Sequence, residues 1–171
     1  MIDLKNIIRN FPNFPKEGII FRDIMPILAN PPYFQHAIEQ IEKTLEDVDY
    51  DIIIAPESRG FIFAAPIALR QSKPLVLARK KGKLPGDVEK QAYSLEYGED
   101  YIEMQKDAIK PNQKIVIIDD LLATGGTVGC ICKMVEYLGG QVSALAFLIE
   151  LEGLGGKEVL NKYNIHSIIK Y

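Results

Sequence analysis

The fold is decided by the stretch Val116-Ile117-Ile118-Asp119-Asp120-Leu121-Leu122-Ala123-Thr124-Gly125-Gly126-Thr127. It opens with a run of β-branched residues, passes through two adjacent carboxylates and a glycine pair, and leads into a helical pattern that extends to about residue 138. A continuous apolar run of this kind is typical of a strand buried on both faces of a parallel sheet. The stretch therefore predicts a strand, a turn and a helix in succession.

Strands and helices alternate on both sides of this stretch. The predicted strands cover residues 51–55, 74–78, 114–119, 141–150 and 165–170, and the predicted helices cover residues 31–47, 61–70, 127–138 and 156–162. This alternation indicates an α/β fold with a mainly parallel central sheet flanked by helices. The chain has 171 residues and no clear internal boundary, so we expect a single domain over residues 1–171.

Two segments depart from the alternation. Residues 1–30 contain prolines and a glycine that interrupt any long helix, and they predict a small N-terminal lobe with its own shape. Residues 79–101 form an excursion punctuated by glycines, and connections of this length are usually functional or disordered. We expect the second segment to be a flexible loop.

The composition excludes several classes of protein. The net charge of −3 argues against a nucleic acid partner, because binding to the phosphate backbone needs a basic excess. Cys130 and Cys132 lie too close together for an ordinary disulfide and are too few for a four-ligand zinc site, which favours a reducing, cytoplasmic location. No apolar run is long enough to span a membrane.

The stretch around the glycine pair carries the chemistry. In open α/β sheets, ligands bind at the carboxyl ends of strands, and the free N–H groups at the start of a helix bind phosphate. Gly125 and Gly126 allow a close approach of the backbone to an anion, and Thr124 and Thr127 add hydroxyl donors. The carboxylates at 119–120 would repel a bare phosphate but could accept hydrogen bonds from sugar hydroxyls or face a metal ion. The whole unit predicts a site for a ribose 5-phosphate group.

Other interpretations of this stretch are weaker. The Walker A lysine and the dinucleotide-binding pattern of three spaced glycines are both absent. The plain structural alternative is that the glycines only turn the chain and the aspartates only cap the helix. That alternative suits the glycine pair alone, but it does not explain why all these groups occur in one unit.

The unit resembles the phosphoribosyl-pyrophosphate motif of the type I phosphoribosyltransferases. The rest of the chain resembles the members of that family that act on adenine, over nearly its whole length. The matching blocks occur in one order at residues 14–24, 57–61, 79–86, 93–97 and 119–127. The resemblance implies an enzyme of purine salvage, a pentosyltransferase that transfers the 5-phosphoribosyl group from phosphoribosyl pyrophosphate to adenine. It also implies that Mg²⁺ is bound mainly through phosphoribosyl pyrophosphate, with no protein ligand to the metal assigned.

The resemblance assigns the phosphate-binding residues. It implies that Asp119 and Asp120 face the ribose hydroxyls. It implies that the 5-phosphate is held by Ala123, Thr124, Gly125, Gly126 and Thr127, and the pyrophosphate by Glu57, Ser58, Arg59, Arg79, Lys80 and Lys83. In similar enzymes, basic residues of this last region reach the site of a neighbouring subunit, which implies a homodimer. A solvated surface cluster is the plainer alternative for these lysines.

The resemblance also assigns the residues around the base. It implies that Phe21 stacks on adenine, while backbone groups of Ile20 and Arg22 hydrogen-bond to its edge. Leu122 is expected to line the base or the ribose. For Ile20 and Phe21, ordinary core packing is the alternative.

A lid is implied for the long excursion, which would close the site against water. Glu96 is the predicted catalytic carboxylate, contacting the imidazole side of adenine and managing its proton as the base attacks. Tyr97 is expected to belong to the same lid. An exposed loop acid is the alternative for Glu96.

Two alternative functions remain open. The first is a phosphoribosyltransferase for another base, which would share residues 119–127 but is disfavoured by residues 14–24 and 93–97. The second is a non-catalytic regulator that senses phosphoribosyl pyrophosphate, for which the chain lacks a basic face or an added DNA-binding segment.

Overall fold

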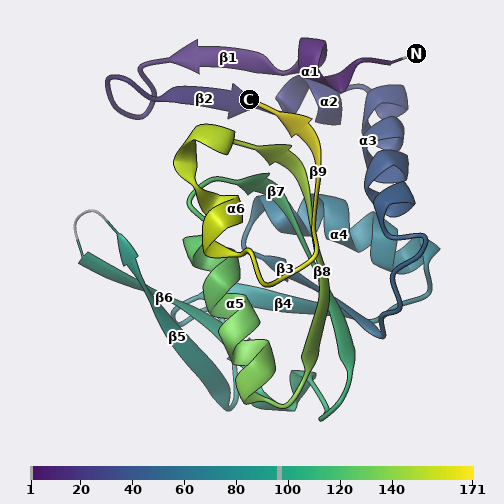
Figure 1. Cartoon of the computed structure of the whole chain (residues 1–171), viewed down its shortest axis with the longest axis vertical. Helices are drawn as coiled ribbons and strands as arrows, with labels where there is room; N and C mark the ends of the chain where they lie inside the picture. The colour runs from purple at the N-terminus through teal and green to yellow at the C-terminus, as the bar shows by residue number, and fades with distance from the viewer. Residues whose placement is uncertain (1, 96–97) are drawn as a thin grey trace.

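A central sheet of seven strands forms the body of the molecule (Figure 1). The computed structural model describes residues 2–95 and 98–171. Five strands are parallel neighbours in the order β4 (Leu75–Lys80), β3 (Ile52–Pro56), β7 (Lys114–Leu122), β8 (Gln141–Glu150) and β9 (Ile165–Lys170). The prediction of an α/β fold with a mainly parallel sheet is confirmed.

Helices cover both faces of this sheet. Helices α3 (Pro31–Thr44) and α4 (Arg59–Arg70) pack on one face, and α5 (Gly126–Tyr137) packs on the other. The side chains of β7 alternate between the two layers: Val116 and Ile118 lie in the core on the α3–α4 side, whereas Ile115 and Ile117 lie in the core on the α5 side. All four are fully buried, which explains the continuous apolar run in the sequence.

An antiparallel hairpin extends the sheet beyond β4. Strand β6 (Gly98–Gln105) pairs with the end of β4, and β5 (Val88–Leu95) pairs with β6. The expectation that residues 79–101 form a loop is therefore wrong in one respect, because residues 79–80, 88–95 and 98–101 lie in paired strands. The flexibility of this segment stays a prediction. Charged and polar residues dominate β5, so it lacks the apolar pattern from which a strand is predicted.

The N-terminal segment forms a separate layer at the end of the sheet where β9 ends (Figure 1). A two-stranded antiparallel sheet joins β1 (Arg9–Pro12) to β2 (Ile20–Asp23), and the short helices α1 (Leu4–Ile7) and α2 (Met25–Leu28) flank it. Arg9 donates to Asp23 across this pair and fixes the ladder. The remaining elements are helix α6 (Gly156–Val159) and the 3₁₀ turns Lys106–Ala108 and Glu152–Leu154.

The helices of the molecule are short relative to the thickness of a membrane. Across residues 2–95 and 98–171, none is both long enough and apolar enough to span a bilayer.

Candidate active site

The strand order reverses between β3 and β7, and a cleft opens there. From β3 the chain passes through α4 to β4 on one side, and from β7 it passes through α5 to β8 on the other side. Since α4 and α5 lie on opposite faces, the loops after β3 and β7 separate at the carboxyl edge of the sheet. The cleft has a volume of about 640 Å³. Its lining residues are Phe21, Pro56, Glu57, Ser58, Arg59, Lys80, Lys83, Asp119, Asp120, Leu121 and Thr127.

Two carboxylates form the floor of the cleft. The Asp120 carboxylate is buried and pairs with Arg59, with 2.9 Å between Oδ2 and the guanidinium Nε. Asp119 Oδ1 accepts a hydrogen bond of 2.8 Å from the Asp120 backbone N–H. Gly60 leaves room for Asp119, because a Cβ at Gly60 would lie 3.0 Å from Asp119 Oδ1. Both acids belong to strand β7, which continues three residues beyond the predicted end at residue 119.

Burial makes the charge on this floor costly. Burial raises the pKa of Asp119 well above its usual value, and the neighbouring charge of Asp120 raises it further. The pKa of Asp120 is also raised by burial, although the Arg59 guanidinium opposes the shift. A ligand that donates hydrogen bonds or brings positive charge to this floor would therefore be stabilised there.

The turn after β7 has the geometry of an anion site. Gly125 has a left-handed φ of +79° and precedes the first residue of α5. Within the described part of the chain no side chain caps this helix, so its first N–H groups point toward the turn. Gly156 supports the turn from below, because a Cβ there would lie only 2.2 Å from the Ala123 carbonyl oxygen. Thr127 lines the cleft, whereas Thr124 is exposed.

Glu57 contacts basic residues at the end of β4 and in the turn after it. Its carboxylate lies 3.2 Å from Lys83 Nζ and 3.4 Å from Arg79 Nε, and it accepts the Lys80 backbone N–H at 3.1 Å. Burial raises the pKa of Glu57, but the hydrogen bonds from Lys80, Lys83 and Arg79 outweigh it and hold the pKa below its usual value. Glu57 thus binds the cations rather than facing an anion directly.

Phe21 brings the N-terminal segment to the cleft. Its ring centroid lies 5.5 Å from the Arg59 guanidinium carbon and packs edge-to-face on Phe14. The Ile20 side chain is exposed, and the Arg22 guanidinium stacks on the ring of Tyr171 at 3.7 Å. Among the described residues β2 pairs only with β1, so its other edge retains backbone donors and acceptors.

Comparison with known proteins identifies the family. A model of the phosphoribosyl transferase domain matches residues 25–169. The adenine phosphoribosyltransferase of Lachnoclostridium phytofermentans is 52% identical over 100% of this chain and 98% of its own length. The chain belongs to the adenine phosphoribosyltransferases. The predictions of the family, the type I fold and a pentosyltransferase of purine salvage are confirmed.

Solved structures of adenine phosphoribosyltransferases share the fold. The enzyme of Thermoanaerobacter pseudethanolicus superposes with a TM-score of 0.96 at 48% identity, covering 98% of both chains. The enzyme of Saccharomyces cerevisiae superposes with a TM-score of 0.90 at 39% identity, covering 96% of both chains. The latter structure is a complex with an imino-altritol bisphosphate and adenine.

Nine of the predicted site residues line the cleft: Phe21, Glu57, Ser58, Arg59, Lys80, Lys83, Asp119, Asp120 and Thr127. Gly125 and Gly126 line a different pocket, beside Cys130 and Leu160. Leu122 lines neither. Its side chain is 1% exposed and packs in the core on the α5 side, so the prediction that it lines the base or ribose is wrong. Leu121 lines the cleft instead. Glu96 and Tyr97 lie outside the described residues, and their roles stay predictions.

Sequence reasoning missed two residues that support the site. Gly156 has no sequence signal of a site beyond its place at the start of a short helix. Its contact with the turn after β7 joins residues more than thirty positions apart in the chain. Tyr171 carried no motif, yet its ring stacks on the guanidinium of Arg22, the residue that follows Phe21 in β2. Both contacts depend on tertiary packing, which the local pattern does not report.

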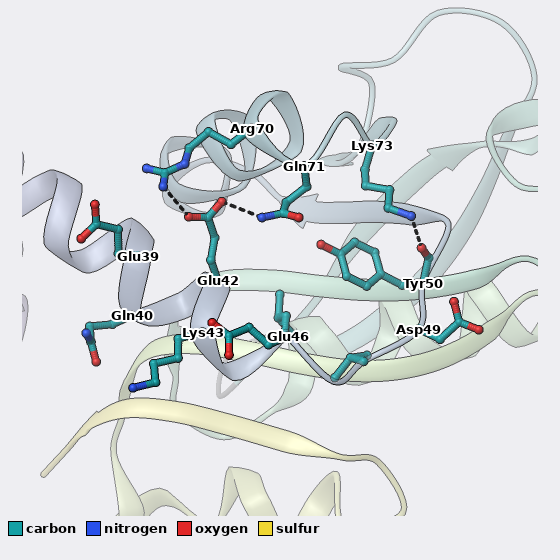
Figure 2. A pocket seen from close by; sticks show the side chains of 12 residues that line it. Glu39, Gln40, Glu42, Lys43, Glu46, Asp49, Tyr50, Arg70, Gln71 and Lys73 are labelled. Carbon is teal, nitrogen blue, oxygen red and sulfur yellow. Dashed lines mark hydrogen bonds and ion pairs between the residues drawn. The ribbon is translucent and has the colours of Figure 1, made fainter.

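A second cavity of this phosphoribosyltransferase also has a volume of about 640 Å³ (Figure 2). It lies where residues precede β3 and β4, at the amino ends of these strands. Several of its polar groups pair within the cavity: Glu42 pairs with Arg70 at 3.1 Å and accepts from Gln71 at 3.0 Å, and Lys73 Nζ donates to the Tyr50 carbonyl at 2.6 Å. The carboxyl-end cleft is therefore the candidate active site.

Proposed function

We propose that this adenine phosphoribosyltransferase joins adenine to phosphoribosyl pyrophosphate in the carboxyl-end cleft. The observation that carries the proposal is the meeting, in one cleft, of a helix N-terminus, two carboxylates and a set of cations. These three features suit the three parts of phosphoribosyl pyrophosphate: a phosphate, ribose hydroxyls and a pyrophosphate. The products are AMP and pyrophosphate.

The donor of the phosphoribosyl group is proposed to lie across the floor of the cleft. The 5-phosphate takes the N–H groups and hydroxyls of residues 123–127, where the dipole of α5 favours an anion. Asp119 and Asp120 accept hydrogen bonds from the ribose hydroxyls. The pyrophosphate is proposed to contact Ser58, Arg59, Arg79, Lys80 and Lys83, and Glu57 is proposed to act at the pyrophosphate through these cations. Of these, the cations neutralise the leaving group, and Glu57 holds Arg79 and Lys83 in place.

Mg²⁺ is proposed to be bound mainly by the oxygens of phosphoribosyl pyrophosphate and by water. The two floor carboxylates offer oxygen ligands, but they are too few to complete an octahedral shell, so the substrate and water supply the rest. When bound, Mg²⁺ neutralises charge on the departing pyrophosphate. A cation near the floor would also stabilise the ionised form of Asp119, whose pKa burial raises.

Adenine is proposed to stack on Phe21 and to hydrogen-bond with the backbone of Ile20 and Arg22 along the free edge of β2. The adenine bound in the yeast relative supports this class of ligand. Attack at the anomeric carbon with inversion builds positive charge on the ribose, so positioning and exclusion of water dominate catalysis. Glu96, on the proposed flexible lid within residues 79–101, is assigned to the adenine proton, and Tyr97 to the same lid.

The assembly is proposed to be a homodimer in the cytoplasm, with no nucleic acid or membrane partner. Leu69 on α4 is 82% exposed and Leu77 on β4 is 37% exposed, so these neighbouring elements offer apolar surface to a second copy. Cys130 and Cys132 are both free thiols, which suits a reducing compartment. Residues 1–171 are proposed to act as one domain, with residues 1–30 as the base-binding lobe.

The residue assignment is tested by pyrophosphate release from phosphoribosyl pyrophosphate and Mg²⁺, with adenine, hypoxanthine, guanine and orotate offered separately. Adenine-only turnover that falls sharply in Glu96→Gln would support both the base lobe and the lid carboxylate. Turnover with another base would refute the role of residues 20–22. Full activity in Glu96→Gln would refute the catalytic role of Glu96.

A further inference from the structure

Glu103 is a buried carboxylate with no part in the proposed chemistry. It lies in the middle strand of the antiparallel extension, and its side chain is 2% exposed. Burying a carboxylate is costly unless it is paired and hydrogen-bonded. Lys90 Nζ lies 3.1 Å from Glu103 Oε1, and the Gly82 backbone N–H donates to Oε2 at 2.9 Å.

The strand register places Glu103 between two cations. On one side it is paired with Arg79 of β4, and on the other side with Lys90 of β5. Cross-strand neighbours on one face lie close enough to interact. Burial raises the pKa of Glu103, but the Gly82 N–H and the Lys90 and Lys81 ammonium groups outweigh it and lower the pKa below its usual value. The carboxylate is therefore held ionised beside residues 79–83, which comprise the end of β4 and the turn after it and are called the basic turn.

Two acids from different elements bind this basic turn. Glu57 forms ion pairs with the side chains of Arg79 and Lys83, and Glu103 accepts a hydrogen bond from the backbone N–H of Gly82. Gly82 directly precedes Lys83, whose carbonyl accepts a hydrogen bond of 2.9 Å from Arg79 Nη1. A shift of Gly82 would therefore move the two cations that Glu57 aligns at the cleft.

We propose that Glu103 is a positioning residue for pyrophosphate recognition, which fixes the turn at residues 79–83 through Gly82 and ties it to the β5–β6 hairpin through Lys90. The inference rests on the proposed contact of this turn with pyrophosphate. Glu103 is not among the residues that line the carboxyl-end cleft, so it is assigned no contact with the substrate. Its effect is confined to ligands that carry the pyrophosphate group, because AMP uses only the 5-phosphate, ribose and adenine parts of the site.

The test measures the Kd of pyrophosphate with Mg²⁺ and the Kd of AMP by calorimetry, together with the KM of each substrate, on the full-length enzyme. Glu103→Ala is expected to raise the Kd of pyrophosphate and the KM of phosphoribosyl pyrophosphate about tenfold, because the Gly82 hydrogen bond to a charged acceptor is lost. The Kd of AMP and the KM of adenine are expected to change less than about twofold. A merely structural role would weaken AMP and pyrophosphate binding alike, and that result would overturn the proposal.

Two further variants keep the inference decidable if Glu103→Ala does not fold. Lys90→Met leaves Gly82 bonded and is expected to weaken pyrophosphate binding about threefold, with AMP binding unchanged. Glu103→Gln retains an oxygen for the Gly82 N–H. Its loss of pyrophosphate affinity is expected to lie between those of Glu103→Ala and Lys90→Met. Unchanged pyrophosphate binding in both variants would refute the inference.

Two control variants separate this inference from the proposed function. Glu152→Gln removes a carboxylate from an exposed ion pair with Lys170 and is expected to leave both dissociation constants unchanged. Lys83→Ala tests the contact between the turn and pyrophosphate directly. If Lys83→Ala binds pyrophosphate as the parent does, that contact is refuted; if it binds weakly while the Glu103 variants bind normally, only the positioning role is refuted.

Discussion

Two cavities of equal volume, about 640 Å³ each, open at opposite ends of the parallel sheet. The carboxyl-end cleft contains the buried Asp120 carboxylate, which pairs with the half-buried Arg59, and a turn that leads into α5. The amino-end cavity is lined by charged side chains such as Glu42 and Arg70, which neutralise each other beside solvent (Figure 2). Size therefore does not distinguish a site from a surface hollow here; strand direction and fixed, buried charge do.

Helix direction explains the difference. Helix α4 begins with Arg59 at the carboxyl-end cleft and ends with Arg70 at the amino-end cavity. The amino terminus of a helix attracts anions, whereas its carboxyl terminus attracts cations. The same helix thus favours a phosphate-rich ligand at one cavity and disfavours it at the other.

The two arginines of α4 give the largest expected contrast. Arg59→Ala is expected to lower kcat/KM on the order of 10²–10³-fold, because it removes a cation from the cleft and leaves Asp120 buried without its partner. Arg70→Ala removes a guanidinium of 47% exposure and is expected to change kcat/KM by less than about twofold. Steady-state kinetics with both substrates measures the contrast. Equal losses in the two variants would contradict the assignment of the carboxyl-end cleft.

Substitutions at two glycines test whether the turn after β7 needs close packing. Gly156→Ala is expected to destabilise the enzyme by about 2 kcal/mol and lower its Tm by roughly 4–8 °C, because the new Cβ would lie 2.2 Å from the Ala123 carbonyl oxygen. Gly153→Ala is the matched control, since a Cβ there would meet no described atom within 4 Å, and its effect is expected to stay within about 0.5 kcal/mol. Thermal and denaturant unfolding measure both. Equal stability of the two variants would show that the turn moves freely away from Gly156.

The features predicted from the sequence are those that local pattern encodes. The apolar run before Asp119 and the glycines after it fix a strand, a turn and a helix, and the parallel sheet then brings the ends of β3, β4 and β7 together. For strands with apolar runs, the predicted bounds lie within a few residues of the bounds in the structure. The polar β5 was missed because its sequence lacks an apolar pattern and its partner β6 is seen only in the fold. The resemblance assigned Glu57 to the pyrophosphate, but it did not reveal the contacts of Glu57 with residues 79–83, which are distant in sequence.

At Leu122 the alternation of side chains between the two faces of β7 does not predict which face the residue occupies. Regular alternation along β7 would place Leu122 on the same face as Ile118, on the α3–α4 side. The structure instead places Leu122 in the core on the α5 side, while Leu121 packs toward the α3–α4 side. The alternation therefore slips across the two aspartates. A one-residue change of face of this kind depends on the tertiary environment of the acids, which the sequence pattern does not reveal.

Two carboxylates of the carboxyl-end cleft, those of Asp119 and Glu57, are expected to affect the stability of the fold with opposite signs. The raised pKa of Asp119 gives stability that is present below its unfolded value of 3.8 and is lost as pH rises through the folded pKa. The lowered pKa of Glu57 gives stability that is present above 4.5 and is lost as pH falls through the folded pKa. At pH 7, Asp119→Asn is thus expected to stabilise the fold by about 1 kcal/mol while reducing activity, and Glu57→Gln to destabilise it by about 1 kcal/mol.

Denaturant unfolding of the parent and of both variants between pH 3 and pH 8 measures how the free energy of unfolding depends on pH in each. The advantage of Asp119→Asn should grow as pH rises from about 4, whereas the cost of Glu57→Gln should shrink as pH falls below about 4.5. Shifts of the same sign at pH 7 would contradict the opposite electrostatic environments of the two acids.

The smallest expected effect lies at the amino-end cavity. Glu42→Gln keeps an oxygen for the Gln71 side chain but removes the charge that faces Arg70. Because Arg70 is 47% exposed, the ion pair is screened by water and salt, and the loss of stability is expected to be below about 1 kcal/mol and to diminish further in high salt. The double variant with Arg70→Ala isolates the pair energy. Activity should not change, since the partners of the Glu42 carboxylate, Arg70 and Gln71, lie at the end of α4 far from the carboxyl-end cleft. A tenfold fall in activity would mean that α4 couples this cavity to Arg59 at the other end of the sheet.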